Sequence, residues 1–167
     1  MSVSNVVYVS GALTDVPHDK RQQYIEFCES IGHLITAMDL RVYVPHWNTD
    51  PVKHKDVTPK QVDLIDRTAV TSAMLVIAVV DNPSLGVGIE VEMAYHANKP
   101  VVLLCKQDLV EARKISRLVR GNPAVIREII YSDFEEARSL LGVFLDSFLK
   151  ELRESVLPAT LVPALSR

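Results

Sequence analysis

The chain has 167 residues, 48% of them hydrophobic, and a formal net charge of −3 at pH 7. This length and composition predict one globular domain with a substantial core, and the balanced charge argues against a nucleic-acid partner. No apolar run approaches the roughly 20 residues that cross a bilayer, and the N-terminus does not resemble a signal peptide. We therefore expect a cytoplasmic protein without a membrane partner. Cys28 and Cys105 lie in apolar stretches, which is typical of core thiols in a reducing compartment.

The first half of the chain alternates predicted strands and helices. A short apolar strand covers 6–10, helical spacing of apolar residues covers 19–40, and a second strand covers 41–44. Residues 46–57 are polar and show no periodicity, and so long a loop in a compact domain is usually functional or mobile. In the helix predicted for 58–72, Thr58 is the N-cap, a proline follows it, and Gln61 closes a capping box.

The second half continues the same alternation. Its predicted elements are a buried strand at 74–80, a helix from about Gly88 to Asn98, a strand at 101–105, a basic irregular stretch at 106–123, a strand at 126–131, and a helix to about Leu152 that opens with a capping box at 132–135.

This order predicts a three-layer α/β fold in which a five-stranded parallel sheet carries helices on both faces, as in flavodoxin-like and Rossmann-like proteins. One domain would span 1–152, and 153–167 would form a C-terminal tail. Ligands of such sheets bind at the carboxyl ends of the strands. The polar residues that we expect to converge there are Tyr8, Ser10, His46, Ser84 and Glu90.

The segment from Ser84 to Glu90, with the sequence SLGVGIE, links a predicted strand to a predicted helix. Gly86 and Gly88 would allow a tight turn and the close approach of a ligand, and free amides at a helix start favour anions. Glu90 would lie in the first turn, where the helix dipole favours its ionised form by about 0.3–1 kcal/mol. A carboxylate so placed can act as a nucleophile at a sugar anomeric carbon. Taken alone, the segment also fits an ordinary strand-to-helix turn.

Four segments together resemble the nucleoside 2-deoxyribosyltransferase superfamily, and within it the 2′-deoxynucleoside 5′-phosphate N-hydrolase branch. They are Val7-Tyr8-Val9-Ser10-Gly11, Asp66, the segment from Pro83 to Glu90, and Ile115-Ser116-Arg117-Leu118-Val119-Arg120-Gly121. The resemblance covers roughly residues 6–131. The chain departs from the family pattern at Ala73-Met74, where the family often has Ala-Asp, and at Glu90-Val91-Glu92, where it usually has Glu-Leu-Gly.

The resemblance implies a role for each residue of the site. Glu90 would be the nucleophile, Asp66 would handle protons at the base, and Tyr8 would position the carboxylate or the sugar. Ser84 would bind the 5′-phosphate, and Ser116 would reach it from a second subunit of a homodimer or dimer of dimers. The expected substrate-binding residues are Ser10, Gly11, His46, Ser84, Gly86, Gly88, Ser116 and Arg120.

Each of these residues also has a plainer interpretation. Glu90 could merely complement a helix dipole, Asp66 could be a surface residue, and Ser84 could be a simple N-cap, which is compatible with phosphate binding. Trp47 could be a loop anchor or a stacking platform for a base. His46 and His54 have no Cys or third His at ligand spacing, so we expect no metal.

The resulting hypothesis is hydrolysis of the N-glycosidic bond of a nucleoside 5′-monophosphate, without a cofactor. Three alternatives remain open: a deoxyribosyltransferase that exchanges bases on free nucleosides, a ribonucleotide N-hydrolase acting for example on CMP, and a non-catalytic nucleotide sensor. The residues leave the base and the sugar undecided.

Overall fold

The computed structural model describes residues 4–12, 16–50 and 52–156 and contains a five-stranded, all-parallel sheet in the order β2-β1-β3-β4-β5. This topology confirms the predicted fold class. The strands are β1 (Val6–Gly11), β2 (Arg41–Tyr43), β3 (Leu75–Val79), β4 (Val101–Lys106) and β5 (Val125–Tyr131).

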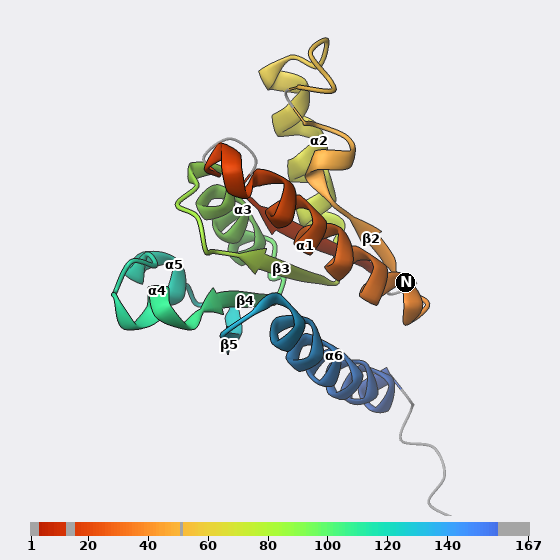
Figure 1. Cartoon of the computed structure of the whole chain (residues 1–167). Helices are drawn as coiled ribbons and strands as arrows, with labels where there is room; N and C mark the ends of the chain where they lie inside the picture. Colours follow the sequence, from red (N-terminus) through yellow and green to blue (C-terminus); the bar gives the residue numbers. More distant parts are fainter. Residues whose placement is uncertain (1–3, 13–15, 51, 157–167) are drawn as a thin grey trace, which may run out of the picture.

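Helices cover both faces of this sheet (Figure 1). They are α1 (His18–Ala37), α2 (Pro59–Ser72), α3 (Leu85–His96), α4 (Gln107–Glu111), α5 (Arg117–Arg120) and α6 (Phe134–Val156), with a short 3-10 helix, η1 (Pro45–Trp47), after β2. Within this part of the chain, no helix is both long enough and apolar enough to cross a membrane.

The core has two halves because side chains alternate between the faces of each strand. Val7 and Val9 of β1 pack with α1 and α6 on one face. Tyr8, between them, packs with α2 and α3 on the other. This alternation decides which polar side chains of the strand ends meet: Tyr8 and Ser10 face α3, whereas Gly11 lies on the side of α1.

One of the two predicted capping boxes is observed as predicted, and the other is shifted. Thr58 and Gln61 cap α2 reciprocally, as predicted. At the start of α6 the cap is shifted by one residue, because the Asp133 carboxylate accepts from the backbone amides of Glu135 and Glu136 at 3.0 and 2.9 Å. The Glu136 side chain in turn accepts from the Ser132 amide at 2.7 Å.

Several predicted boundaries differ from those observed. Helix α1 ends at Ala37 because Asp39 adopts a left-handed conformation with φ 59°. The stretch 106–123 is not wholly irregular, since it contains α4 and α5. Helix α6 runs past Leu152 to Val156, so the start of the predicted tail is helical; the remainder of that tail lies outside the described residues.

The segment around Glu90 corrects the sequence interpretation most. Helix α3 begins at Leu85, with Ser84 as its N-cap, so both glycines lie inside the helix. No described glycine has a positive φ, so neither Gly86 nor Gly88 makes the predicted tight turn. Glu90 consequently lies in the second turn of α3, where the helix dipole contributes less than we expected.

Candidate active site

Glu90 is a carboxylate on the apolar stripe of a helix. Val87, Val91 and Ala94 are the buried residues of α3, and Glu90 lies on their side of the helix because it is three positions from Val87 and four from Ala94. Its side chain therefore points toward β1. The Tyr8 hydroxyl donates to Glu90 Oε1 at 2.8 Å, and the Ser10 hydroxyl donates to Oε2. Both oxygens of the carboxylate are thus held by buried side chains of one strand.

A second carboxylate lies beside the first. Tyr43 of β2 pairs in register with Tyr8, and the two rings stack with centroids 5.3 Å apart and planes 13° apart. The Tyr43 hydroxyl donates to Oδ1 of Asp66, on α2, at 2.9 Å. The structure therefore brings together Glu90, Asp66, Tyr8 and Ser10, and adds Tyr43, which the sequence interpretation missed.

Burial governs the protonation of both carboxyl groups. It raises the pKa of Glu90 to about 7, with a further contribution from the negative charge of Asp66, while the hydrogen bonds from Ser10 and Tyr8 oppose the rise. The pKa of Asp66 is also raised, mainly by burial and less by Asp63, against the hydrogen bond from Tyr43. Burial and the Glu90 charge raise the pKa of Tyr8, so its hydroxyl remains a neutral donor.

The first turn of α3, on the same helix as Glu90, is exposed at Leu85 and Gly86. The Ser84 hydroxyl accepts from the Val87 amide at 3.4 Å and caps the helix. A Cβ atom placed on Gly88 would meet no described atom within 4 Å, and one on Gly86 would meet only the Ser84 hydroxyl, at 3.6 Å. A helical glycine is about 1 kcal/mol less favourable than alanine. Neither packing nor backbone conformation within the described chain explains these two glycines.

Gly11 differs, because its packing does require a glycine. A Cβ atom there would lie 2.9 Å from the Tyr24 hydroxyl and 3.3 Å from Cys28 Sγ. The same Tyr24 hydroxyl accepts from the Ala12 amide at 2.9 Å, which fixes the chain as it leaves β1. Contact of Gly11 with a substrate stays a prediction.

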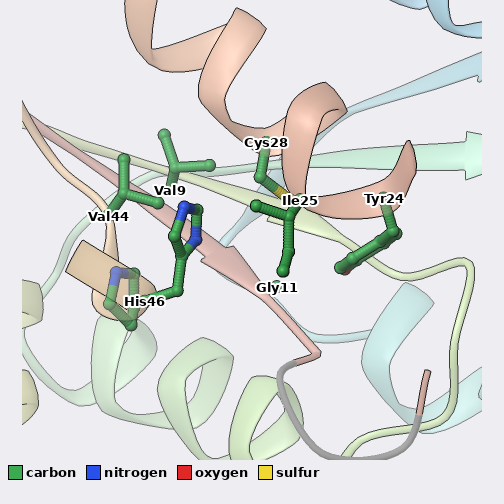
Figure 2. Close-up of a pocket in the computed structure, with 8 residues that line it drawn as sticks. Val9, Gly11, Tyr24, Ile25, Cys28, Val44 and His46 are labelled. Carbon is green, nitrogen blue, oxygen red and sulfur yellow. The ribbon is translucent and has the colours of Figure 1, made fainter. Parts of the chain in front are cut away.

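His46 lies apart from Glu90. It is 2% exposed, and its Nε2 atom is 3.3 Å from Oε1 of Glu29 on α1. Figure 2 shows its ring in a small pocket against the α1 side of β1, whose other lining residues are Val9, Gly11, Tyr24, Ile25, Cys28, Val44 and Pro45. Burial lowers the pKa of His46, and Glu29 opposes the change. The expected convergence of His46 with Tyr8 and Ser10 is wrong, because they occupy opposite faces of β1.

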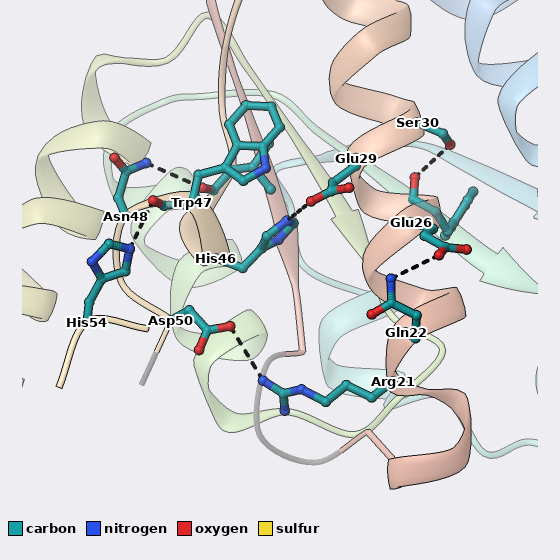
Figure 3. A network of polar contacts seen from close by, with 12 residues as sticks. Arg21, Gln22, Glu26, Glu29, Ser30, His46, Trp47, Asn48, Asp50 and His54 are labelled. Atoms are coloured by element: carbon teal, nitrogen blue, oxygen red, sulfur yellow. Dashed lines mark hydrogen bonds and ion pairs between the residues drawn. The ribbon is translucent and has the colours of Figure 1, made fainter. Parts of the chain in front are cut away.

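The loop after β2 is fastened to α1 by several contacts (Figure 3). The Trp47 ring lies so close to Gly32 that a Cβ atom there would be 3.0 Å from it. Asp50 pairs with Arg21 at 3.5 Å, and its carboxylate also accepts from the Val52 amide at 2.7 Å. Of the two interpretations of Trp47, the loop anchor is the one that this geometry supports.

Comparison with known proteins places the chain in a family. No family model matches it. Over 113 residues it is 32% identical to "Putative 2′-deoxynucleoside 5′-phosphate N-hydrolase 1" of Thermofilum pendens, an alignment that covers 65% of this chain and 78% of the relative. The chain belongs to the nucleoside 2-deoxyribosyltransferase-like superfamily. This is a family of nucleotide or nucleoside N-glycosidases and deoxyribosyltransferases, as the resemblance in the sequence implied.

Several solved structures share the fold. The CMP N-glycosidase BcmB of Clostridium botulinum superposes with a TM-score of 0.61 at 22% identity, covering 83% of this chain and 98% of that one. The solution structure of BlsM gives a TM-score of 0.66 at 20% identity, with 96% and 99% covered. The 2-desoxiribosyltransferase of Leishmania mexicana gives 0.53 at 12% identity, with 83% and 97% covered.

Two further residues that were predicted to bind the substrate have other partners in this structure. Ser116 is exposed and caps α5, accepting from the Val119 amide at 3.4 Å. Arg120 places its guanidinium on the Glu128 carboxylate, with hydrogen bonds of 2.8 and 2.7 Å. Substrate contacts of both residues stay predictions, and for Arg120 they would have to compete with Glu128.

Among the residues that the structure describes, no three His, Cys, Asp or Glu side chains gather as a possible metal site. Both cysteines are buried free thiols, as predicted. The candidate site offers for chemistry a pair of carboxylates, each with tyrosine or serine hydroxyl donors.

Proposed function

We propose that this protein hydrolyses the N-glycosidic bond of nucleoside 5′-monophosphates, with Glu90 as the nucleophile. The observation that carries the proposal is the hydrogen bonding of Glu90, since Tyr8 and Ser10 hold both of its oxygens on a partly buried helix face. A surface carboxylate that only complemented a helix dipole would need neither contact. The name of the Thermofilum pendens relative supports the same reaction and a phosphorylated substrate.

The proposed reaction uses the two carboxyl groups in different protonation states. Ionised Glu90 attacks the anomeric carbon, the bond from that carbon to the base nitrogen breaks, and Asp66 gives its proton to the departing base. Water then attacks the anomeric carbon of the glycosyl ester while Asp66 accepts a proton from it. Glu90 is thereby released, and the sugar phosphate leaves with retained configuration.

Both roles depend on protonation, and burial shifts the pKa of each carboxyl group. A pKa of about 7 leaves a substantial fraction of Glu90 ionised at neutral pH. The raised pKa of Asp66 makes it a better proton donor at the same pH than an ordinary aspartate. This chemistry needs no cofactor.

The 5′-phosphate would bind at the start of α3. The first amides of a helix have no partner within the helix and favour anions, and the Ser84 hydroxyl lies at that point. A ligand lying close to the backbone there would account for Gly86 and Gly88, which the described packing does not explain. Binding energy from the phosphate would help to position the sugar against Glu90.

We further propose that the active form is a homodimer in which Ser116 of the partner subunit completes the phosphate site. Three large apolar side chains on α3 and α5 support a contact surface: Leu85 and Leu118 are each 87% exposed, and Ile89 is 55% exposed. Leu85 and Ile89 are four positions apart and so lie on one face of α3. An exposed apolar stripe of this kind is typical of an interface.

Base release tests the function directly. The purified protein is incubated with deoxyribonucleoside and ribonucleoside 5′-monophosphates and with free nucleosides, each with and without an added acceptor base, and the products are separated by chromatography. Release of free base from monophosphates, independent of the acceptor, is the expected result. Turnover of free nucleosides that requires an acceptor would replace the proposal with the transferase alternative. The CMP N-glycosidase BcmB, which shares the fold, makes the ribonucleotide arm worth including.

Glu90→Ala serves as the matched blank in each arm of this assay. Activity that survives in Glu90→Ala would come from a contaminant or from a different nucleophile. Binding of nucleotides without base release in any arm would favour the sensor alternative.

A further inference from the structure

Asp81 is a carboxylate that the proposed chemistry does not use, at the carboxyl edge of the sheet. Its Oδ1 atom accepts from the backbone amide of Lys106 at 2.9 Å, and its Oδ2 atom accepts from the Tyr131 hydroxyl. Lys106 ends β4 and Tyr131 ends β5. A single side chain that follows β3 therefore spans the ends of the two strands beyond it, which lie side by side in Figure 1.

The chain between β3 and α3 has little else to hold it. Its last backbone contact with the sheet is the hydrogen bond from the Val80 amide to the Leu104 carbonyl, at 3.1 Å. Within the described residues, Asn82 and Pro83 take part in no backbone hydrogen bond. The Asp81 side chain is thus the anchor of the short segment that leads to Ser84.

Tyr131 fixes the position of the Asp81 carboxylate. Its side chain is 1% exposed and packs in the core against the rings of Phe27 and Phe134, with centroid distances of 5.8 and 6.3 Å. A ring held in this way cannot swing with the loop, so its hydroxyl defines where the Asp81 carboxylate lies. Burial raises the pKa of Asp81, and the hydrogen bonds from Tyr131 and the Lys106 amide oppose the change.

We propose that Asp81 and Tyr131 are positioning residues that hold Ser84 in place for the 5′-phosphate of the substrate. The inference rests on the proposed function, because it takes Ser84 as a phosphate ligand. Neither residue would touch the substrate. Neither contacts Glu90, which bonds to Tyr8 on the α3 side of β1, whereas Tyr131 packs on the α1 and α6 side of the sheet. Their loss should weaken the binding of the phosphate and leave the chemistry on the sugar unchanged.

The experiment measures phosphate recognition without relying on turnover. Ribose 5-phosphate, which carries the phosphate and no base, is titrated into the full-length protein by calorimetry. The variants are Tyr131→Phe, Ser84→Ala and the double variant. Ile129→Val is the matched control, because it removes one methylene from the same buried face of β5 without touching Asp81.

We expect Tyr131→Phe to weaken ribose 5-phosphate binding about five- to twentyfold, less than the full effect of one hydrogen bond to a charged group, because the Lys106 amide still holds Asp81. Ile129→Val should bind like the wild type. The double variant should lose no more than Ser84→Ala alone, because both changes act through the same serine. Asp81→Asn, which keeps an oxygen able to accept from the Lys106 amide, should show the same direction of loss if Tyr131→Phe does not fold.

Separate outcomes distinguish the inference from the function on which it rests. Normal ribose 5-phosphate binding in Tyr131→Phe, together with weakened binding in Ser84→Ala, overturns the positioning role alone. Fully additive losses in the double variant overturn it as well. Absence of binding by the wild-type protein, with no base release from any monophosphate, overturns both proposals.

Discussion

Tyr8 and Tyr43 stack with their ring centroids 5.3 Å apart, and each gives its hydroxyl to a different carboxylate. Tyr8 holds Glu90 and Tyr43 holds Asp66, so one pair of rings fixes two acidic groups drawn from different helices. The negative charge of Asp66 contributes to the raised pKa of Glu90. Coupled carboxyl groups of this kind tend to carry one proton between them, and the proposed reaction requires that proton to be on Asp66 when Glu90 attacks.

The first prediction concerns the pH dependence of catalysis. Because Glu90 must be ionised to attack, kcat/KM should rise with pH through about 7. The hydrogen bond from Ser10 lowers the pKa of Glu90, so Ser10→Ala should move this limb to higher pH. Ser30→Ala is the control, because Ser30 bonds to the Phe27 carbonyl within α1. An unchanged limb in Ser10→Ala would show that another group titrates there.

A second prediction is that Glu90→Gln lowers base release and raises the free energy of unfolding. Base release should fall roughly 10³-fold or more, as when a nucleophile is removed. The folded-state pKa of about 7 lies above the ordinary value of 4.5, so the protonated carboxyl favours folding and its contribution is lost as pH rises from 4.5 through 7. Glu90→Gln should therefore exceed the wild type in free energy of unfolding by about 1–2 kcal/mol at pH 8 and hardly at all below pH 4.5. Urea denaturation at the two pH values measures the difference, and equal stability at pH 8 would contradict it.

A third prediction separates a functional glycine from a structural one. Gly88→Ala should raise the free energy of unfolding by about 1 kcal/mol, because a Cβ atom there meets nothing and alanine favours the helix. The same change should lower kcat/KM if a ligand lies against that turn. Gly142→Ala in α6, whose Cβ atom would meet Leu34 at an ordinary 3.8 Å, should stabilise without affecting activity. Full activity in Gly88→Ala would argue that no substrate group lies there.

Ser84→Ala provides the fourth prediction. The preference for a monophosphate over its free nucleoside, expressed in kcat/KM, should shrink by about 1–2 kcal/mol. Asp133→Ala is the control, because it removes the N-cap of a different helix at a similar cost to stability. Equal changes in the two variants would mean that the effect is one of helix stability.

The fifth prediction tests the shared site. Glu90→Ala and Ser116→Glu, each inactive alone, should recover activity when mixed and allowed to exchange subunits, because one hybrid site carries both lesions and the other carries neither. Analytical ultracentrifugation of each variant checks that dimers form. A fully active monomer at micromolar concentration would exclude the arrangement, and failed complementation after proven exchange would keep the dimer but remove the shared site.

The sequence predicted the order of strands and helices well, because buried strands and capped helices depend on local patterns such as the capping box at Thr58. The predicted convergence of His46 with Tyr8 and Ser10 failed. The carboxyl edge of a sheet has two faces, and the sequence does not indicate on which face a residue that follows a strand lies. For Gly86 and Gly88 the sequence predicts a turn, because a glycine pair after a strand permits one, whereas the structure has both inside a helix.

Tyr43 and Asp81 were missed although each carried a signal. Tyr43 stands at the end of β2 in register with Tyr8, a relation that appears only once the strands are aligned. Asp81 directly follows the strand predicted at 74–80, at the carboxyl edge of the sheet. The role of Ser116 depends on a second subunit, which no pattern within one chain can position.

Because Glu90 lies on the apolar stripe of α3, the number of residues between Ser84 and Glu90 decides whether its carboxylate points toward β1. Each residue turns a helix by about 100°, so inserting or deleting one residue between Ser84 and Glu90 would carry the carboxylate away from β1. The helix could still form and cover the sheet, and the protein would fold without its nucleophile in place. Substitutions at the exposed Leu85 and Ile89 leave that phase intact. Within a single chain, the position of Glu90 should therefore withstand substitutions at Leu85 and Ile89 but no change in the length of the segment.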